Sequence, residues 1–177
     1  MADGVTDPGW VRRALDRYER PLLAYALRIV GCDADAARDV VQETFTRLLR
    51  QPPSAGADLN GRLAEWLYTV CRNAALDMRR KEKRMTPMLD TAADTIPSDA
   101  TPPDVVAETN DSSSHVLKLL ARLTENQQEV IRLKFQHQMS YRQISAITGH
   151  SESNVGFLIH AGLKSIREKL ATADERG

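Results

Sequence analysis

Residues 140–170, SYRQISAITGHSESNVGFLIHAGLKSIREKL, carry the pattern that most constrains the fold of this chain. They predict a short helix, a glycine turn and a longer helix. Ser140 and Gln143 have the spacing of a capping box at the start of the first helix. Gly149 suits the left-handed residue that ends it, and Ser151 is placed to cap the second helix. Two helices joined by so few residues are typical of a helix-turn-helix, which presents its second helix to the major groove of DNA.

The predicted second helix has an apolar side and a polar side. At about 100° per residue, the apolar side predicts a core formed by Val155, Leu158, Ile159, Leu163, Ile166 and Leu170. The opposite side carries Ser153, Phe157, His160, Lys164 and Glu168. That side is only weakly basic, so a helical hairpin packed for protein contact stays open as an alternative. The paired caps and the glycine turn favour DNA.

Charge is segregated along the chain, although its formal net charge is zero. Residues 85–113 contain six acidic residues and neither Lys nor Arg, whereas residues 1–84 and 114–177 each have a net charge of +3. The acidic segment is rich in Pro and poor in large apolar side chains, so we expect a flexible linker. Helical periodicity without strand alternation predicts an all-α protein, with two small helical domains, 1–84 and 114–177, on either side of that linker.

The amino-terminal block predicts three helices. The first runs from about residue 8 or 10 to residue 30 and ends at Gly31. The second begins near Asp33 or Asp35, whose carboxylates suit a helix N-terminus, and ends before Pro52. The third covers about residues 61–84. The other block begins near residue 114 and also has a helical pattern, and Thr124 with Gln127 forms a capping box before QQEVIRLKF.

The second of these helices has a polar face. Its apolar flank consists of Ala37, Val40, Val41, Thr44, Phe45, Leu48 and Leu49. Its polar flank consists of Asp39, Gln42, Glu43 and Thr46. Such a face is solvated in many proteins, and an acidic, amide-rich one also suits docking onto a basic helix of a partner.

The third helix predicts a nucleic-acid surface. Its apolar stripe consists of Leu63, Trp66, Leu67, Val70, Ala74 and Met78. Tyr68, Arg72 and Arg79 are expected on the far side, and the helix runs into RRKEKR, which includes Arg80, Lys83 and Arg84. Basic side chains bind phosphates and an aromatic ring stacks on an unpaired base. Bases at a helix end also complement its dipole, which is the structural alternative. Asp77 is expected near the apolar stripe, held by a neighbouring Arg or by Asn73.

The chain shows no pattern of an enzyme, a metalloprotein or a membrane protein. We find no phosphate-binding glycine loop, no metal-ligand spacing and no histidine with an acidic partner. Cys32 and Cys71 stand alone, as expected for reduced thiols in the cytoplasm. No apolar segment is long enough to span a bilayer, and no secretory signal is evident. We therefore expect a cytoplasmic, non-catalytic protein without cofactor or metal.

Four segments in this order resemble one known family. DVVQETFTRLL (residues 39–49), WLYTVCRNAALDMRR (66–80), LTENQQEVIRLKF (123–135) and the helix-turn-helix look like an extracytoplasmic-function sigma factor, the small two-domain class of bacterial sigma subunits. The resemblance covers about residues 10–84 and 114–171. It implies a protein that binds core RNA polymerase, directs it to promoter DNA and aids DNA opening. It also implies an anti-sigma factor as a partner, and a monomer when free.

The resemblance assigns roles to the candidate residues. The first domain is expected to bind polymerase through Asp39, Gln42, Glu43 and Thr46. Candidates for contact with the −10 element are Trp66, Tyr68, Arg72, Asn73, Asp77, Arg79, Arg80, Lys83 and Arg84. The loop between Gln51 and Arg62 is expected to receive an everted base. Candidates for the −35 element are Tyr141, Arg142, Ser151, Ser153, Asn154, Phe157, His160 and Lys164.

The recognition helix departs from the family in composition. Where relatives carry several Arg, this chain has Gly156, Leu158, Ala161 and Gly162. Two other functions are weighed against a sigma factor. A dimeric helix-turn-helix operator-binding regulator would bind DNA specifically without polymerase. A helical adaptor that binds only proteins would tolerate charge reversal at Arg79 and Arg80.

Overall fold

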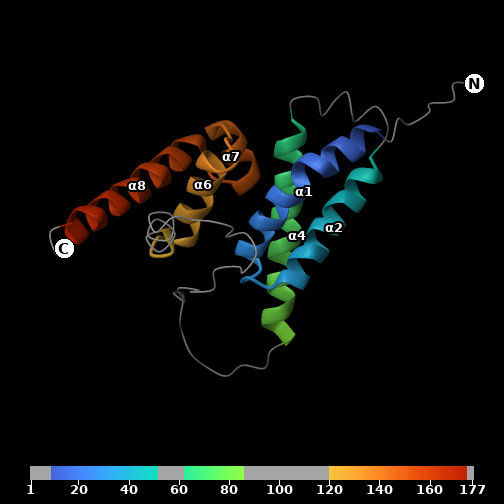
Figure 1. Ribbon diagram of the computed structural model, residues 1–177, viewed down its shortest axis with the longest axis horizontal. Coiled ribbons are helices and arrows are strands. Elements are labelled where there is room, and N and C mark those ends of the chain that lie inside the picture. The colour runs from blue at the N-terminus through green and yellow to red at the C-terminus, as the bar shows by residue number, and fades with distance from the viewer. Residues whose placement is uncertain (1–8, 52–61, 86–119, 175–177) are drawn as a thin grey trace, which may run out of the picture. The chain divides into compact units, whose positions relative to one another are not determined.

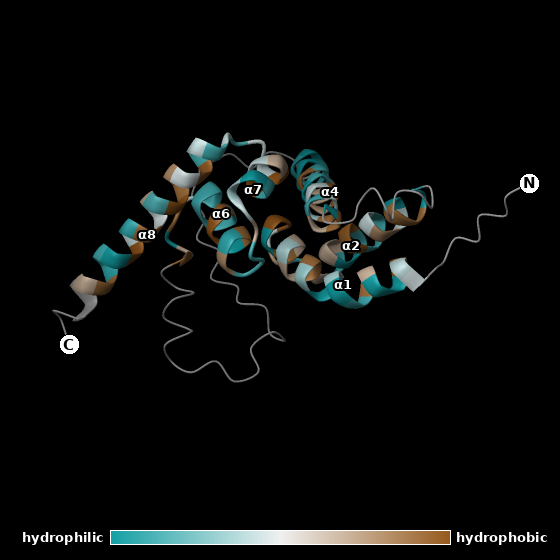
Figure 2. Ribbon diagram, turned by 90° about the horizontal axis from the view of Figure 1, so that it is seen from above, coloured by the Kyte–Doolittle hydropathy of each residue, from teal (hydrophilic) through white to brown (hydrophobic). Residues whose placement is uncertain are grey.

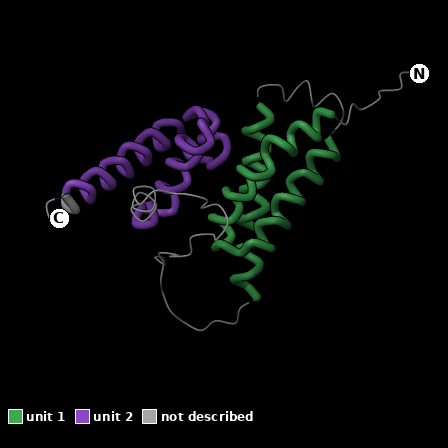
Figure 3. The backbone as a smooth tube through the Cα atoms, in the orientation of Figure 1, with its two compact units in different colours: residues 1–90 green, residues 91–177 purple. Residues whose placement is uncertain are grey.

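The computed structural model describes residues 9–51, 62–85 and 120–174. All regular elements in these ranges are helices, which confirms the all-α prediction (Figure 1). Residues 86–113 of the predicted linker, and residues 52–61 of the loop expected to receive a base, lie outside them. The chain divides into two compact units, Met1–Asp90 and Thr91–Gly177 (Figure 3).

Unit 1 is a bundle of three helices, α1 (Gly9–Ile29), α2 (Ala34–Leu49) and α4 (Leu63–Met85), each of which packs against the other two. Gly31 follows α1 with a φ of +76°, as expected for the residue that ends a helix in the left-handed conformation. The Asp33 carboxylate caps α2 and accepts hydrogen bonds from the backbone N–H groups of Asp35 and Ala36 at 2.9 and 3.0 Å.

The core of unit 1 is made by the facing apolar sides of these helices, coloured brown in Figure 2. The largest fully buried side chains are Leu22, Val40, Thr44, Leu48, Leu67, Tyr68 and Cys71. The hydroxyl of Thr44 donates to the Val40 carbonyl at 2.8 Å and so is satisfied inside its own helix.

The buried side of α4 differs from the predicted stripe. It consists of Leu67, Tyr68, Cys71 and Ala75, so the helix is rotated by part of a turn from the stripe through Trp66, Val70 and Ala74. Trp66, Leu67 and Tyr68 are consecutive, and the pattern alone does not determine which two of them face the core. The partners on α1 and α2 decide it.

Two leucines assigned to the core lie at the surface. Leu49, at the end of α2, is 67% exposed, and Leu163 on α8 (Glu152–Asp174) is 37% exposed. Leu49 directly follows Leu48, and Leu163 directly follows Gly162, and both of these neighbours are buried. Because successive residues on a helix are about 100° apart, only one member of such a pair points directly inward.

Unit 2 contains α6 (Glu125–Phe135), α7 (Tyr141–Thr148) and α8, and the predicted capping boxes are present. The backbone N–H of Gln127 donates to the Thr124 hydroxyl at 3.4 Å, and that of Gln143 donates to the Ser140 hydroxyl at 3.2 Å. In return, the side-chain oxygen of Gln127 accepts the backbone N–H of Thr124, and that of Gln143 accepts the backbone N–H of Ser140. These caps set the starts of α6 and α7.

The turn between α7 and α8 is the one expected of a helix-turn-helix. Gly149 ends α7 with φ +79° and ψ 2°, and its N–H donates to the Ser145 carbonyl. The Ser151 hydroxyl accepts the Asn154 backbone N–H at 3.2 Å, which caps α8 as predicted. The core beneath this turn contains the fully buried side chains of Val130, Leu133, Ile144 and Val155.

Gly162 marks the close approach of α8 to α6. A Cβ added at this position would lie 2.6 Å from Ile131 Cδ1 and 3.4 Å from Leu123 Cδ1. The position therefore faces the core of unit 2, and the absence of an Arg here has a packing cause rather than a DNA-binding one.

Candidate polymerase-binding and DNA-binding surfaces

The polar face predicted on α2 is present at the surface of unit 1. Asp39 and Gln42 are exposed, while Glu43 and Thr46 are half-buried. Arg47 Nε donates to Glu43 Oε1 at 2.8 Å, and the Thr46 hydroxyl donates to the Gln42 carbonyl at 2.8 Å. Gln42 and Glu43 each lie three or four positions from both Asp39 and Thr46, so the four residues form one surface, which we call the α2 face.

Leu49 extends the α2 face by a further turn and is a residue that the sequence analysis missed. It follows Thr46 by three positions and is mostly exposed. A large apolar side chain at the end of a polar helix face adds contact area for a partner. The sequence gives no signal for its exposure, because Leu49 continues the apolar flank through Val41 and Phe45 at a spacing of four residues, and both of those are buried.

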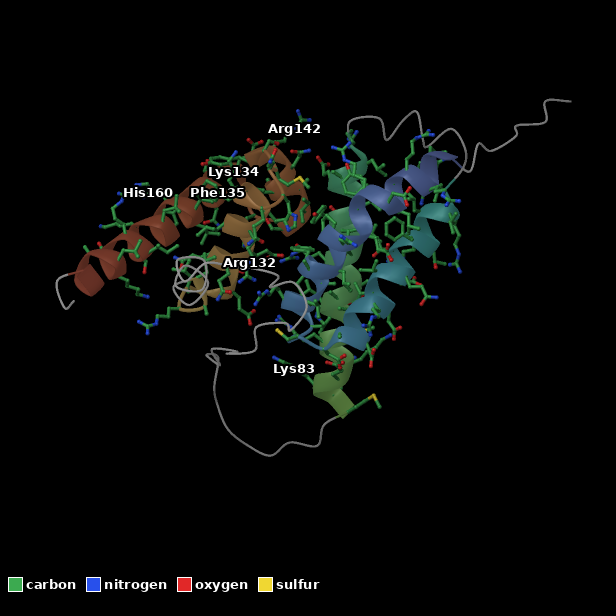
Figure 4. All side chains as sticks on the ribbon, viewed as in Figure 1. Lys83, Arg132, Lys134, Phe135, Arg142 and His160 are labelled. Atoms are coloured by element: carbon green, nitrogen blue, oxygen red, sulfur yellow. The ribbon has the colours of Figure 1, made fainter. Side chains whose placement is uncertain are left out.

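Candidates on α4 fall into two rows. Opposite the buried side lie Trp66, Asn73, Asp77, Arg80 and Arg84, all exposed except Trp66, which is half-buried. On one flank lie Arg72 and Arg79, both half-buried, and Lys83, which is exposed near the carboxyl end of the helix (Figure 4). Five basic side chains thus line the surface of one helix, as needed for contact with successive phosphates.

Asp77 is exposed and does not lie near the apolar core, which corrects its predicted position. Arg80 Nη1 contacts Asp77 Oδ1 at 3.2 Å, so the expectation that a neighbouring Arg holds it is confirmed. Both side chains are about two-thirds exposed, at 70% and 64%. An ion pair this exposed contributes little stability, so Arg80 can exchange its partner for a phosphate at small cost.

Tyr68 is not a DNA-stacking residue, contrary to the prediction. Its side chain is 2% exposed, and its ring centroid lies 5.2 Å from that of Tyr25 at an interplanar angle of 58°. Burial raises the pKa of its phenol well above the usual value. An aromatic pair of this geometry belongs to the core of unit 1.

We expect replacement of Tyr68 to change stability and not promoter contact. Tyr68→Ala should lower the free energy of unfolding by about 3–5 kcal/mol, as for other buried aromatic residues, measured by denaturant titration. Tyr68→Leu should keep enough packing to fold, and should support transcription as well as the native protein does. Trp66→Leu is the matched control and should lose promoter opening with little loss of stability. A folded Tyr68→Leu variant with defective opening would contradict the assignment.

The predicted −35 candidates lie on the surface of unit 2. Those on α8 and its cap, Ser151, Ser153, Asn154, Phe157, His160 and Lys164, are all exposed. On α7, Tyr141 and Arg142 are exposed, and Figure 4 shows Arg142 and His160 projecting from their helices. Tyr141 approaches α8 at Gly156, where an added Cβ would lie 3.5 Å from Tyr141 Cε2.

The middle of this surface is aromatic and only weakly basic. Phe157 is 67% exposed. Lys164 Nζ lies 3.9 Å from Glu168 Oε1, with both side chains mostly exposed, and Lys134 Nζ lies 5.2 Å from the centre of the Tyr141 ring. An exposed Phe on the recognition helix, with a single exposed Lys two turns further along, favours contact with a few bases over dense contact with phosphates.

The titratable groups with shifted pKa values are buried or half-buried within the two units. Burial raises the pKa of the Cys71 thiol to about 12, and its Sγ lies 3.9 Å from the Leu22 carbonyl oxygen. Burial, with the nearby Arg132 charge, lowers the pKa of His137 to about 4. Within the described ranges, no three side chains of the His, Cys, Asp or Glu type come together to hold a metal ion. No described helix is long and apolar enough to cross a membrane.

Comparison with known proteins finds the same two units. Residues 14–85 match the Sigma-70 region 2 family, and residues 115–166 match the family described as Sigma-70, region 4. The ECF RNA polymerase sigma factor SigL of Mycobacterium tuberculosis is 31% identical over 157 residues, which cover 89% of this chain and 86% of SigL. The chain belongs to the extracytoplasmic-function (ECF) sigma factors.

Other ECF sigma factors and related proteins are similar over the same extent. The RNA polymerase sigma factor CarQ of Myxococcus xanthus is 28% identical over 166 residues, covering 89% of this chain and 91% of CarQ. The ECF RNA polymerase sigma factor SigW of Bacillus subtilis is 26% identical over 165 residues, covering 88% and 86%. Matches that include both units favour a sigma factor over a dimeric operator-binding regulator, for which the helix-turn-helix alone would suffice.

Proposed function

We propose that this protein binds core RNA polymerase, directs it to a two-part promoter and helps to open the DNA near the −10 element. The observation that carries the proposal is the presence, in one chain, of a region 2 unit with an exposed α2 face and a region 4 unit with an exposed recognition helix. A regulator that acted alone would need only the second. The protein acts by binding and not by catalysis.

The α2 face is the proposed polymerase-binding surface. Asp39 has no hydrogen-bond or ion-pair partner among the described residues, so its carboxylate is available to a basic side chain of the polymerase. Glu43 is already paired with Arg47, and its carboxylate is exposed enough to bind a basic side chain of the polymerase as well. Leu49 adds apolar area at one end of the face. Charged residues flanking an apolar contact are typical of interfaces in which electrostatics select the partner.

The two rows on α4 are the proposed −10 surface. Arg79, Arg80, Lys83 and Arg84 would contact the phosphates, and Trp66 would lie against an unstacked base. Trapping an unstacked base offsets the cost of unpairing it, which is a few kcal/mol. Asn73, exposed in the same row as Trp66, has an amide that can hydrogen-bond to a base edge or to a phosphate.

The outer surface of α8 is the proposed −35 surface. Residues in the first turns of a recognition helix contact base edges, and the preceding helix contacts the backbone. Phe157 would contact a thymine methyl group, while Tyr141 and Arg142 at the start of α7 would contact phosphates. His160 and Lys164, one and two turns further along α8, complete the surface.

Dependence on polymerase follows from the small charge of each domain. Each carries a net charge of only +3, so few phosphates are neutralised and either domain alone binds DNA weakly. Holding both domains on polymerase raises their effective concentration at the promoter and makes the weak contacts sufficient. The acidic segment over residues 85–113 would follow a basic channel of the polymerase. We further propose a cytoplasmic monomer, held inactive by an anti-sigma factor.

Runoff transcription tests this function and identifies the promoter. Purified protein is added to core RNA polymerase with a library of genomic fragments, and the transcripts are sequenced. We expect transcripts from a small set of fragments that share two short motifs, and only when both protein and core are present. Transcription from the same fragments by core alone, or none with the protein added, would contradict the proposal.

A further inference from the structure

His150 lies in the turn between α7 and α8, and hydrogen bonds connect its backbone to α7. The Thr148 hydroxyl is buried and donates to the Ile144 carbonyl at 2.7 Å. The same hydroxyl oxygen accepts the backbone N–H of His150 at 3.4 Å. Ile144 is fully buried, so this chain of hydrogen bonds ties the backbone of His150 to the core of unit 2.

The His150 side chain connects that anchor to an exposed residue of the recognition helix. Its Nδ1 lies 3.4 Å from Nδ2 of Asn154, whose side chain is exposed. Its Nε2 is buried and has no hydrogen-bond partner in the described parts of the chain. The ring is therefore enclosed at one edge and free to hydrogen-bond only at the other, where Asn154 lies.

Asn154 is also held through its backbone. Its N–H donates to the Ser151 hydroxyl at 3.2 Å, which places it in the first turn of α8. The backbone position and the side-chain amide are thus fixed by two different partners. Among the exposed polar side chains in the first turn of α8, that of Asn154 is held by a residue outside the helix.

The hydrogen-bonding capacity of the two side chains decides what the pair can recognise. A neutral imidazole has one donor and one acceptor nitrogen, and an amide has two N–H donors and a carbonyl oxygen. An asparagine contacts adenine through Oδ1 and one Nδ2 hydrogen, which pair with the N6 amino group and N7 in the major groove. The second Nδ2 hydrogen is left over. If Nδ1 of His150 is the acceptor nitrogen, it takes this hydrogen and leaves the adenine-binding edge open.

We propose that His150 is a positioning residue that orients the Asn154 amide to recognise an adenine in the −35 element. The inference rests on the proposed function, because it assumes that α8 enters the major groove of a promoter. It assigns specificity to an amide held by a histidine, on a helix that carries few basic side chains.

Two isosteric substitutions separate orientation from packing. His150→Asn keeps a polar atom where Nδ1 lies. His150→Leu has the shape of the asparagine variant but no polar atom, so the two variants remove the same part of the ring and differ only in hydrogen bonding. His150→Gln moves the amide toward the Nε2 position and provides a second comparison with His150→Asn if the leucine variant does not fold. Folding of each is checked by circular dichroism. The substrate is the promoter found by runoff transcription, with each −35 base pair replaced in turn, transcribed by the reconstituted holoenzyme.

The native protein should prefer adenine at one −35 position by about five- to a hundredfold. Asn154→Ala should abolish this preference, His150→Leu should reduce it at least about threefold, and His150→Asn should keep most of it. In the Asn154→Ala background, the two His150 substitutions should no longer differ. Equal preferences in His150→Leu and His150→Asn, or in the Gln and Asn variants, would overturn the inference. An equal loss at every −35 sequence would overturn it too. Failure of the native protein to direct transcription would instead refute the proposed function.

Discussion

Replacing Asp39 and Glu43 with lysine should abolish binding of this protein to core RNA polymerase while leaving it folded. Both positions lie on the α2 face, and two reversed charges would oppose the basic surface that this face is proposed to contact. Placing like charges opposite each other at an interface weakens binding by several kcal/mol, so we expect the dissociation constant to rise at least about a hundredfold. Binding is measured with fluorescently labelled protein and core polymerase.

The fold should tolerate this change because Asp39 is exposed and the side chain of Glu43 is 45% exposed. The only ion pair lost among the described contacts, Glu43–Arg47, is about half exposed and should contribute less than about 1 kcal/mol to stability. The matched control is Asp16→Lys with Glu19→Lys, which reverses two exposed acids on α1. Polymerase binding that survives in the first variant, or is lost equally in both, would refute the docking role of the α2 face.

Replacing Arg79 and Arg80 with glutamate should abolish transcription from the native promoter without preventing polymerase binding. These side chains lie in the two rows on α4 that are proposed to contact −10 DNA. Removing two phosphate contacts should reduce the promoter affinity of the holoenzyme by roughly ten- to a hundredfold. In a plot of the logarithm of the binding constant against the logarithm of salt concentration, the slope should decrease in magnitude by about two. Runoff transcription and binding at several salt concentrations measure both effects.

The control for this variant is a pair of arginines on another helix of the same unit. Arg12→Glu with Arg13→Glu makes the same change in net charge on α1, where both side chains are exposed. We expect it to retain transcription. Activity of the Arg79→Glu, Arg80→Glu variant on the native promoter would refute the −10 assignment and would favour a helical adaptor, for which the basic end of α4 is merely solvated.

Helix ends were predicted accurately because their causes are local. Asp33, Thr124 and Ser140 cap helices through bonds to residues two or three positions away, and Gly31 and Gly149 adopt the left-handed conformation expected from their places after apolar runs. Such interactions are encoded in four or five consecutive residues. A single sequence therefore contains all the information they need.

The buried faces were predicted less accurately because their causes are not local. Tyr68 packs against Tyr25, which lies 43 positions earlier, so the buried side of α4 depends on a contact distant in the sequence. Leu49 and Leu163 have the composition of core residues, and only the positions of the neighbouring helices leave them at the surface. The rotation of α4 removed Tyr68 from the proposed DNA surface and left its basic candidates there.

The contact between His150 and Asn154 also could not be predicted from the sequence. The two residues are four positions apart, but one stands in the turn and the other in α8, so their approach depends on the backbone between them, where Ser151 caps the helix. Gly162 is a similar case. In the sequence, a glycine in place of an Arg suggests a weaker DNA-binding surface, whereas in the structure the position faces Ile131 on α6 and has no room for a side chain.

The central claim is that promoter recognition requires both this protein and core polymerase. Its most direct test is the binding of a labelled promoter fragment by the protein alone, by core alone and by the two together, at physiological salt. We predict a specific complex only with both components, and binding by the protein alone at least about a hundredfold weaker. Tight, specific binding of duplex DNA by the purified protein without polymerase would contradict the account.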